Sequence, residues 1–173
     1  MDEFAEAFAG RSIYSVGDLY SGYGQFQLAV DSRDITTMRT PIRLVRMFTL
    51  PQGATNSVPH IVNAMNKVLR DCIPGIMISF LDDIPIKGCS DEEKDESKDK
   101  DGCRKFVVDH MKDCEKVLER IEDANLTFSR EKSTFGQPKN LAVGHLCGAY
   151  DQKPSSSKVN VIKDMKEECK TQT

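Results

Sequence analysis

The fold is decided by the stretch Ile76-Met77-Ile78-Ser79-Phe80-Leu81-Asp82-Asp83-Ile84-Pro85-Ile86, in which two apolar runs flank a pair of carboxylates. Residues 76–81 have the composition of a buried strand, and residues 84–86 resume it after the interruption. The stretch therefore predicts a β-hairpin with Asp82 and Asp83 at its tip.

A third carboxylate, Asp18, follows the β-rich residues 12–16. Carboxylates among apolar strand residues are costly to ionise, and a site that gathers several usually pairs them with a hard divalent cation. Two such ions would stabilise the attacking and leaving oxygens of a phosphoryl transfer. Successive strand side chains point to opposite faces, so one of Asp82 and Asp83 should be the better partner for Asp18. The alternative is that Asp-Asp is an ordinary turn dipeptide and Asp18 merely precedes a glycine turn.

Hydrophobic periodicity predicts the remaining elements. Helices are expected at 2–9, 57–70, 107–121 and 158–169, and strands or short β segments at 12–16, 26–30, 35–40, 45–50, 126–128 and 141–143. No internal repeat interrupts this order. It predicts an α+β fold in which helices pack on one face of an antiparallel sheet.

Residues 91–105 form a strongly charged segment, with seven acidic and five basic side chains among fifteen residues. Such a composition is typical of a solvated loop. Only Cys103 offers an apolar anchor, so we expect the loop to be flexible and its deletion to change the melting temperature by only a few degrees.

The composition bounds the function. A chain of 173 residues with 39% hydrophobic residues is one domain, and its net charge of −3 does not by itself indicate a nucleic-acid partner. No segment combines a basic stripe with stacking aromatic residues. No apolar run is long enough for a membrane span, and the acidic N-terminus does not resemble a leader, so we expect an intracellular protein of the cytoplasm or nucleus, not a secreted one.

The six cysteines lack zinc-finger spacing, and reduced thiols are the default in those compartments. Cys103, His110 and Cys114 could form a metal triplet. The competing interpretation is that Cys114 belongs to the apolar face of the helix at 107–121.

Six short motifs occur in order along the chain. They are Gly17-Asp18-Leu19-Tyr20-Ser21-Gly22-Tyr23-Gly24-Gln25, Leu50-Pro51-Gln52-Gly53-Ala54-Thr55-Asn56, Phe80-Leu81-Asp82-Asp83, Val117-Leu118-Glu119-Arg120 with His110 and Asn125-Leu126, Glu131-Lys132-Ser133-Thr134-Phe135, and Val143-Gly144-His145. Together they resemble the palm region of reverse transcriptases, most closely those of gypsy-type long-terminal-repeat retrotransposons.

The resemblance implies a single reverse-transcriptase-like domain over residues 1–173, with part of the fingers at about 25–55 and a palm-like antiparallel sheet in the remainder. It implies an RNA-directed DNA polymerase that uses two-metal nucleotidyl transfer. Its cofactor would be Mg²⁺, with Mn²⁺ as a substitute. Its partners would be an RNA/DNA template-primer and deoxynucleoside triphosphates, without a membrane; the oligomeric state stays open.

The resemblance also implies roles for particular residues. Asp18 and Asp82 would be the principal metal ligands, with Asp83 as the third acidic partner. Nucleotide binding would fall to Tyr23, which rejects a ribose 2′-hydroxyl, to Gln52 and Gly53 at the incoming nucleotide, and to Lys132 near the triphosphate. Gly144 and His145 would lie at the primer grip.

Two departures from the family pattern favour an alternative function. Pro85 removes a backbone donor from the returning strand of the hairpin, and Arg43 stands where the family commonly has a turn glycine. A catalytically inactive or co-opted remnant that acts as a binding or structural protein is therefore the second hypothesis. A generic acidic α+β protein is the third. Because the family's thumb and first fingers strands lie outside residues 1–173, we expect the isolated chain to be a poor polymerase.

Overall fold

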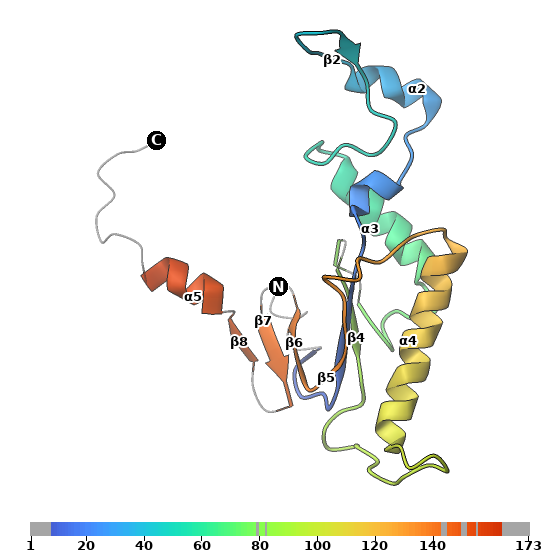
Figure 1. The fold of residues 1–173 in the computed structure, drawn as a ribbon, viewed down its shortest axis with the longest axis vertical. Coiled ribbons are helices and arrows are strands. Elements are labelled where there is room, and N and C mark those ends of the chain that lie inside the picture. Colours follow the sequence, from blue (N-terminus) through green and yellow to red (C-terminus); the bar gives the residue numbers. More distant parts are fainter. Residues whose placement is uncertain are drawn as a thin grey trace.

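A computed structural model of the chain describes residues 8–78, 80–81, 83–142, 145–149, 152–154 and 156–163. Its central sheet has the strand order β4-β1-β5, in which β1 (Tyr14–Asp18) pairs antiparallel with both β4 (Asp83–Lys87) and β5 (Thr134–Gln137) (Figure 1). The register of β1 with β4 runs from Tyr14 opposite Lys87 to Asp18 opposite Asp83.

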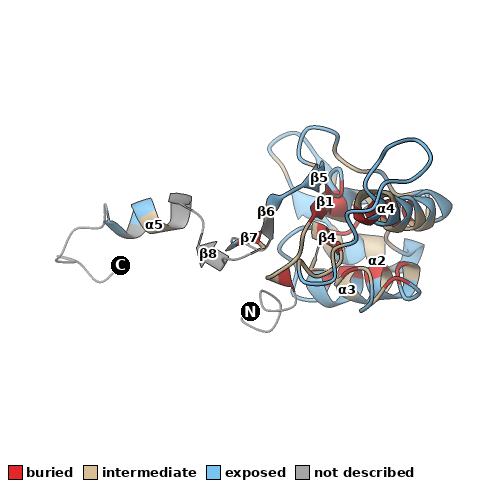
Figure 2. Ribbon diagram, turned by 90° about the horizontal axis from the view of Figure 1, so that it is seen from below, coloured by how far each residue is buried: buried red, intermediate tan, exposed pale blue. Residues whose placement is uncertain are grey.

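Two helices cover one face of this sheet, as the sequence predicts. α3 (Ser57–Val68) and α4 (Lys105–Asp123) carry apolar stripes that join the inward side chains of β4 in one core. The stripes arise from the 3.6-residue helical period, which brings residues three and four apart onto one face. Figure 2 shows the buried residues gathered where these helices meet β1 and β4. The fully buried members of the core are Ile61, Met65, Leu69, Met77, Ile84, Ile86 and Val117.

Shorter elements complete the fold. The segment after β1 contains η1 (Gly22–Gln25), α2 (Val30–Arg33), η2 (Asp34–Thr36) and the hairpin of β2 (Met38–Arg39) with β3 (Leu44–Val45). A second three-stranded antiparallel sheet consists of β6 (Lys139–Ala142), β7 (His145–Gly148) and β8 (Gln152–Pro154), and α5 (Ser156–Lys163) follows it. Within the described ranges, no helix is both long and apolar enough to cross a membrane.

The predicted hairpin at 76–86 is present, but its first arm is not a continuous strand. Phe80 and Asp83 exchange both backbone hydrogen bonds, and the Lys87 N–H donates to the Ile76 carbonyl. Pro85 lies midway between these two donors on β4 and has no N–H. The outer ladder therefore reduces to isolated bridges at Met77 and Phe80. Pro85 itself is fully buried, and its missing donor faces this outer ladder rather than β1.

The helix and strand predictions between residues 20 and 70 are correct only in part. The helix at 57–70 is confirmed as α3, whereas the strand predicted at 35–40 is replaced by η2 and the two-residue β2. Ile35 is 85% exposed, so no second layer of structure covers this segment. Its β-branched residues therefore lack the burial that would favour a strand. The segments expected as strands at 26–30 and 45–50 do not form continuous strands, since Val30 begins α2 and β3 ends at Val45. They meet at an isolated bridge between Gln27 and Thr49, where the N–H groups of Leu28 and Leu50 donate to the carbonyls of Phe48 and Phe26.

Elsewhere the agreement is closer. The helix at 107–121 is confirmed as α4, and the segment at 141–143 overlaps β6. The sequence patterns missed β5, β7 and β8, which are short strands with polar, glycine or proline residues. Of the helix expected at 2–9, only Phe8 is described, and of the helix expected at 158–169, residues 158–163 belong to α5 while the remainder lies outside the described residues.

The charged loop at 91–105 is anchored by polar contacts that composition did not indicate. The carbonyls of Asp95 and Ser97 accept hydrogen bonds from the N–H groups of Phe106 and Lys105, which begin α4. The Asp95 carboxylate also pairs with Lys105 at 3.0 Å. Lys94 and Arg104 each lie 5.1 Å from the centroid of the Phe106 ring. The loop therefore caps the N-terminus of α4.

Candidate active site

Asp18 and Asp83 lie side by side at one end of the central sheet, on the face that the helices leave open. Ser15 contacts α4 through His110, so the alternation of strand side chains turns Asp18 to the opposite face. Asp83 is directly across from Asp18 in the β1–β4 register, and directly opposed residues of an antiparallel pair share a face. The two strands thus present two carboxylates together.

The environment of Asp18 suits a cation. Its Oδ1 atom is buried and has no hydrogen-bond partner, and Lys132 Nζ lies 3.5 Å away, too far for a short hydrogen bond. The Asp18 backbone is fixed on both sides, because its N–H donates to Ser133 Oγ at 3.1 Å and its carbonyl accepts from the Ser129 N–H at 2.7 Å. Carboxylates directly opposed across two strands repel each other. A divalent cation would relieve this repulsion and give Oδ1 a closer partner than Lys132, so the residues present fit such an ion.

Asp82, the other predicted principal ligand, lies outside the described residues. Among the described residues, Asp83 is the one directly opposite Asp18 in the register of β1 with β4. The sequence left open which of the two neighbours is the better partner for Asp18. The register makes Asp83 the stronger candidate among the residues that the structure covers.

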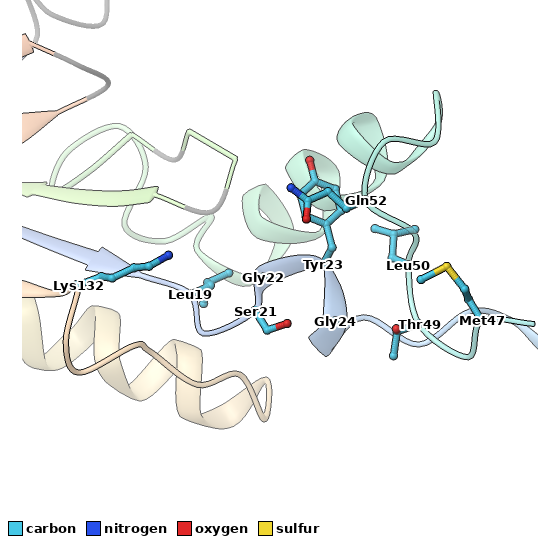
Figure 3. A pocket seen from close by; sticks show the side chains of 10 residues that line it. All are labelled: Leu19, Ser21, Gly22, Tyr23, Gly24, Met47, Thr49, Leu50, Gln52 and Lys132. Carbon is cyan, nitrogen blue, oxygen red and sulfur yellow. The ribbon is translucent and has the colours of Figure 1, made fainter. Parts of the chain in front are cut away.

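A cavity of about 410 Å³ opens beside Leu19, next to Asp18. Three predicted nucleotide-binding residues from three separate segments line it: Tyr23 of η1, Gln52 of the loop before α3, and Lys132 of the loop before β5. Figure 3 shows Lys132 approaching from the β1 side, whereas Tyr23 and Gln52 lie toward α3. Gly53 does not line the cavity; its φ of 92° and the open space around its Cα leave its backbone accessible beside Gln52. The remaining lining residues are Leu19, Ser21, Gly22, Gly24, Met47, Thr49 and Leu50.

The loop that carries Tyr23 is held by Gln25, a residue to which the sequence analysis assigned no role. The Gln25 side chain donates to the carbonyls of Tyr20 and Thr127 at 2.7 and 3.0 Å and accepts from the Thr127 N–H at 2.7 Å. A Cβ at Gly24 would lie 2.7 Å from Ser21 Oγ, so any larger residue there would displace that hydroxyl. These contacts fix the position of η1 relative to the end of β1. Two of the three hydrogen bonds of Gln25 go to Thr127, 102 residues away, and no local sequence pattern predicts them.

The predicted primer-grip pair falls at the β6–β7 hairpin. His145 begins β7, is half-buried and pairs with Ala142 of β6 and Pro154 of β8. Gly144 lies outside the described residues.

An exposed aromatic ring with two arginines lies on the segment that projects beyond α3 at the top of Figure 1. The Arg33 and Arg46 guanidinium carbons are 4.8 and 5.9 Å from the centroid of the Phe48 ring, which is 57% exposed. Arg46 also pairs with Asp34. Arg46 and Phe48 come from one segment, and the fold adds Arg33 of α2 to them.

The proposed metal triplet of Cys103, His110 and Cys114 does not assemble. Cys103 is exposed, whereas His110 and Cys114 are buried with their Nε2 and Sγ atoms 3.6 Å apart. Burial lowers the pKa of His110 and raises the pKa of Cys114, so both stay neutral. Among the residues that the structure describes, no cluster of three or more His, Cys, Asp or Glu side chains could hold a metal ion. Cys114 belongs to the core, as the competing interpretation held.

The chain was compared with known proteins. The family described as "Reverse transcriptase (RNA-dependent DNA polymerase)" matches residues 2–161. Among curated proteins, the chain is 28% identical over 150 residues to the retrovirus-related Pol polyprotein from transposon gypsy of Drosophila melanogaster, covering 87% of this chain and 13% of that protein. It is 24% identical over 164 residues to the corresponding polyprotein from transposon 412 of the same organism, covering 95% of this chain and 12% of that protein. The chain therefore spans about an eighth of the length of these relatives.

Solved structures share the fold. The foamy viral protease-reverse transcriptase in complex with dsDNA superimposes with a TM-score of 0.75 at 21% identity, over 97% of this chain and 32% of that one. The same enzyme in complex with an RNA/DNA hybrid gives a TM-score of 0.73 at 22% identity, over 93% of this chain and 20% of that one. The family match covers the whole central sheet, the paired carboxylates and the cavity beside them, and the chain belongs to the reverse transcriptase family.

Proposed function

We propose that the chain is the palm, with part of the fingers at about residues 25–55, of an RNA-directed DNA polymerase from a retrotransposon polyprotein. The observation that carries this proposal is the convergence of Tyr23, Gln52 and Lys132 on one cavity beside Asp18. Three segments that are distant in sequence supply these residues, and the family motifs indicate each of them independently.

In this proposal, Asp18, Asp82 and Asp83 hold Mg²⁺, or Mn²⁺ in its place. When bound, the ions would neutralise charge on the substrate phosphates. The chain's own residues position the reactants, which is the larger part of catalysis in phosphoryl transfer. Lys132 would exchange its contact with Asp18 for the triphosphate. Tyr23 would pack against the sugar, Gln52 and the Gly53 backbone would contact the incoming nucleotide, and Gly144 and His145 would hold the primer end.

The template-primer is the proposed macromolecular partner. The foamy viral protease-reverse transcriptase forms complexes with dsDNA and with an RNA/DNA hybrid. On this chain, the group of Arg33, Phe48 and Arg46 supplies positive charge and an exposed ring, which suit a phosphate backbone and an unpaired base.

The second hypothesis, an inactive or co-opted remnant, rested on Pro85 and Arg43. Pro85 is accommodated because its missing donor faces only isolated bridges, so it leaves the β1–β4 register intact up to Asp18 and Asp83. This accommodation favours the catalytic hypothesis.

Sugar discrimination tests the proposal. A fluorescent deoxyadenosine triphosphate analogue, with Mn²⁺ present, should bind the chain, and unlabelled dATP should displace it more effectively than ATP. Tyr23→Ala should reduce this preference by roughly tenfold, because it removes the ring proposed to exclude the 2′-hydroxyl. Tyr20→Ala is the matched control, since Tyr20 is 65% exposed and does not line the cavity. Equal displacement by dATP and ATP in the unmodified chain, or the same loss in both variants, would contradict the proposal.

A further inference from the structure

A long groove runs between α4 and β5, away from the nucleotide cavity, with which it shares no lining residue. Its volume is about 1330 Å³, above the range of roughly 300–1,000 Å³ for small-molecule sites. The wall formed by α4 extends from Phe106 to Glu122, a length of about 24 Å at the helical rise per residue. These dimensions suit a helical segment of about four turns rather than a metabolite.

The groove exposes apolar side chains that a monomeric surface would be expected to cover. Met111 and Leu118 of α4 are 63% and 41% exposed, and Phe135 of β5 is 42% exposed. Met111 and Leu118 are seven residues apart, so they lie on the same stripe of the helix. A contiguous apolar stripe with a polar margin is the usual mark of a protein-binding surface.

Three carboxylates form a second stripe beside the apolar one: Glu115, Glu119 and Glu122. The spacing of four and then three residues places them together along the groove, where like charges repel. All three are exposed, and none has an ion pair or side-chain hydrogen bond within the described part of the chain. The stripe is therefore left uncompensated by the fold.

The basic residues of α4 that could have neutralised this stripe are directed elsewhere. Lys112 pairs with Asp109 at 3.3 Å, Lys116 donates to the Asp71 carbonyl at 3.1 Å, and Arg120 pairs with the Asp71 carboxylate at 3.1 Å. Including the loop at the end of the groove, five carboxylates line it against two basic side chains. Such a field repels nucleic acid and attracts a cationic polypeptide.

We propose that this groove, here called the α4 groove, is a docking site for a basic amphipathic helix of another polypeptide. Apolar residues on one face of the partner would pack on Met111, Leu118 and Phe135. Lysines or arginines spaced three and four residues apart along its margin would pair with Glu115, Glu119 and Glu122. This function is separate from polymerisation and does not depend on the active site.

Fluorescence anisotropy with a synthetic probe tests the proposal. The probe is a labelled 15-residue helical peptide with a leucine face and a lysine margin; a peptide of the same design with glutamates in place of the lysines is its control. The lysine peptide should bind the 173-residue chain saturably, and the glutamate peptide should not. The triple variant Glu115→Gln/Glu119→Gln/Glu122→Gln should weaken binding by about tenfold or more, because rim charges across an interface set the attraction.

A charge-matched control separates the groove from general electrostatics. Glu92→Gln/Glu93→Gln/Glu131→Gln changes the net charge by the same amount at residues outside the groove and should leave the affinity within about twofold. Met111→Ser should also weaken binding, since it removes an exposed apolar contact. Equal affinity in both triple variants, or no saturable binding of the lysine peptide, would overturn the proposal. Sedimentation that reveals a dimer of this chain which Met111→Ser dissociates would assign the groove to a second copy instead and would equally overturn it.

Discussion

Ser15 is a buried hydroxyl on β1 that ties three elements together beneath the active-site end of the sheet. It accepts a hydrogen bond from the Gly136 N–H at 3.0 Å, lies 2.8 Å from His110 Nε2 and accepts from Cys114 Sγ at 3.4 Å. A hydroxyl has one proton and two lone pairs, so with two donors directed at it, Ser15 donates to His110 Nε2. The network therefore assigns the imidazole proton to Nδ1, which lacks a hydrogen-bond partner.

This network makes the stability of the fold depend on pH. Burial lowers the pKa of His110 below its ordinary value of 6.5. Below that value the unfolded chain binds the proton more readily than the folded chain, so the free energy of unfolding should fall as pH decreases through 6.5. Urea unfolding between pH 5 and 7.5 should show this slope in the unmodified chain and a smaller slope in His110→Gln. An identical slope in both proteins would mean that other groups cause the dependence.

Ser15→Ala tests the network without changing a charge. The substitution leaves the Gly136 N–H and the imidazole without their shared partner, which should lower the free energy of unfolding by about 1–3 kcal/mol. Ser12→Ala is the control, since Ser12 is only partly buried and bonds at the edge of the fold to Cys89. A cost no greater than that of Ser12→Ala would contradict a linking role for Ser15.

The sequence predicted those residues of the candidate site whose roles are known from a family motif. Tyr23, Gln52 and Lys132 were predicted from the resemblance, and they line one cavity. Gln25 and Ser133 were not assigned roles, because their function is to bond to backbone groups of segments more than a hundred residues away. No periodicity or local spacing records such a contact.

At the scale of elements, the charged loop illustrates a limit of composition. Twelve charged side chains predict solvation, and all of them except Asp91 and Lys94 are exposed, but the carbonyls of Asp95 and Ser97 cap α4. Hydrogen bonds from Ser97, together with the contact to Lys105, lower the pKa of Asp95 to about 2. Its charged form is favoured in the folded state, so its stabilising contribution is present above the ordinary pKa of 3.8 and is lost as pH falls toward 2.

Deletion of residues 92–100 should therefore lower stability more than the composition suggests. Loss of two capping hydrogen bonds costs roughly 2 kcal/mol, or about 4–8 °C in melting temperature for a domain of this size. Differential scanning calorimetry measures the shift. The control Glu92→Ser/Glu93→Ser keeps the capping carbonyls and should melt within about 2 °C of the unmodified chain. A deletion variant that melts with the unmodified chain would restore the expectation that the loop is dispensable.

Pro85 shows that the composition of a strand also does not predict how the strand pairs. Composition predicted an uninterrupted buried arm at 76–81, whereas only Met77 is fully buried and the other described apolar residues of the arm are half-buried. The arm is broken because its partner strand lacks one donor, which depends on pairing and not on the arm's own residues. The long helices α3 and α4 were predictable because their periodicity is local.

At the scale of the whole molecule, the chain carries slightly more acidic than basic residues, 27 against 24. The group around Phe48 is the one to which we assign the nucleic-acid backbone. Affinity for a template-primer comes mainly from phosphate contacts and falls steeply with salt. We therefore predict that the isolated chain extends an oligo(dT) primer on poly(rA) poorly at physiological salt, with Mg²⁺ or Mn²⁺, compared with its Asp18→Asn variant as background. Robust extension above that background would mean that this surface alone grips the substrate.

The central claim is that Asp18 and its neighbours hold a divalent cation beside the nucleotide cavity. A titration of Mn²⁺ in the presence of dATP, followed by water-proton relaxation, tests it most directly because it requires no template-primer. The control is Asp31→Asn, which changes an exposed aspartate of α2. The unmodified chain and this control should both show a saturable enhancement of the water-proton relaxation rate beyond that of Mn²⁺-dATP alone. Asp18→Asn should lose that enhancement while remaining folded, since the substitution relieves repulsion between opposed carboxylates. Retention of the full enhancement in Asp18→Asn would contradict the account.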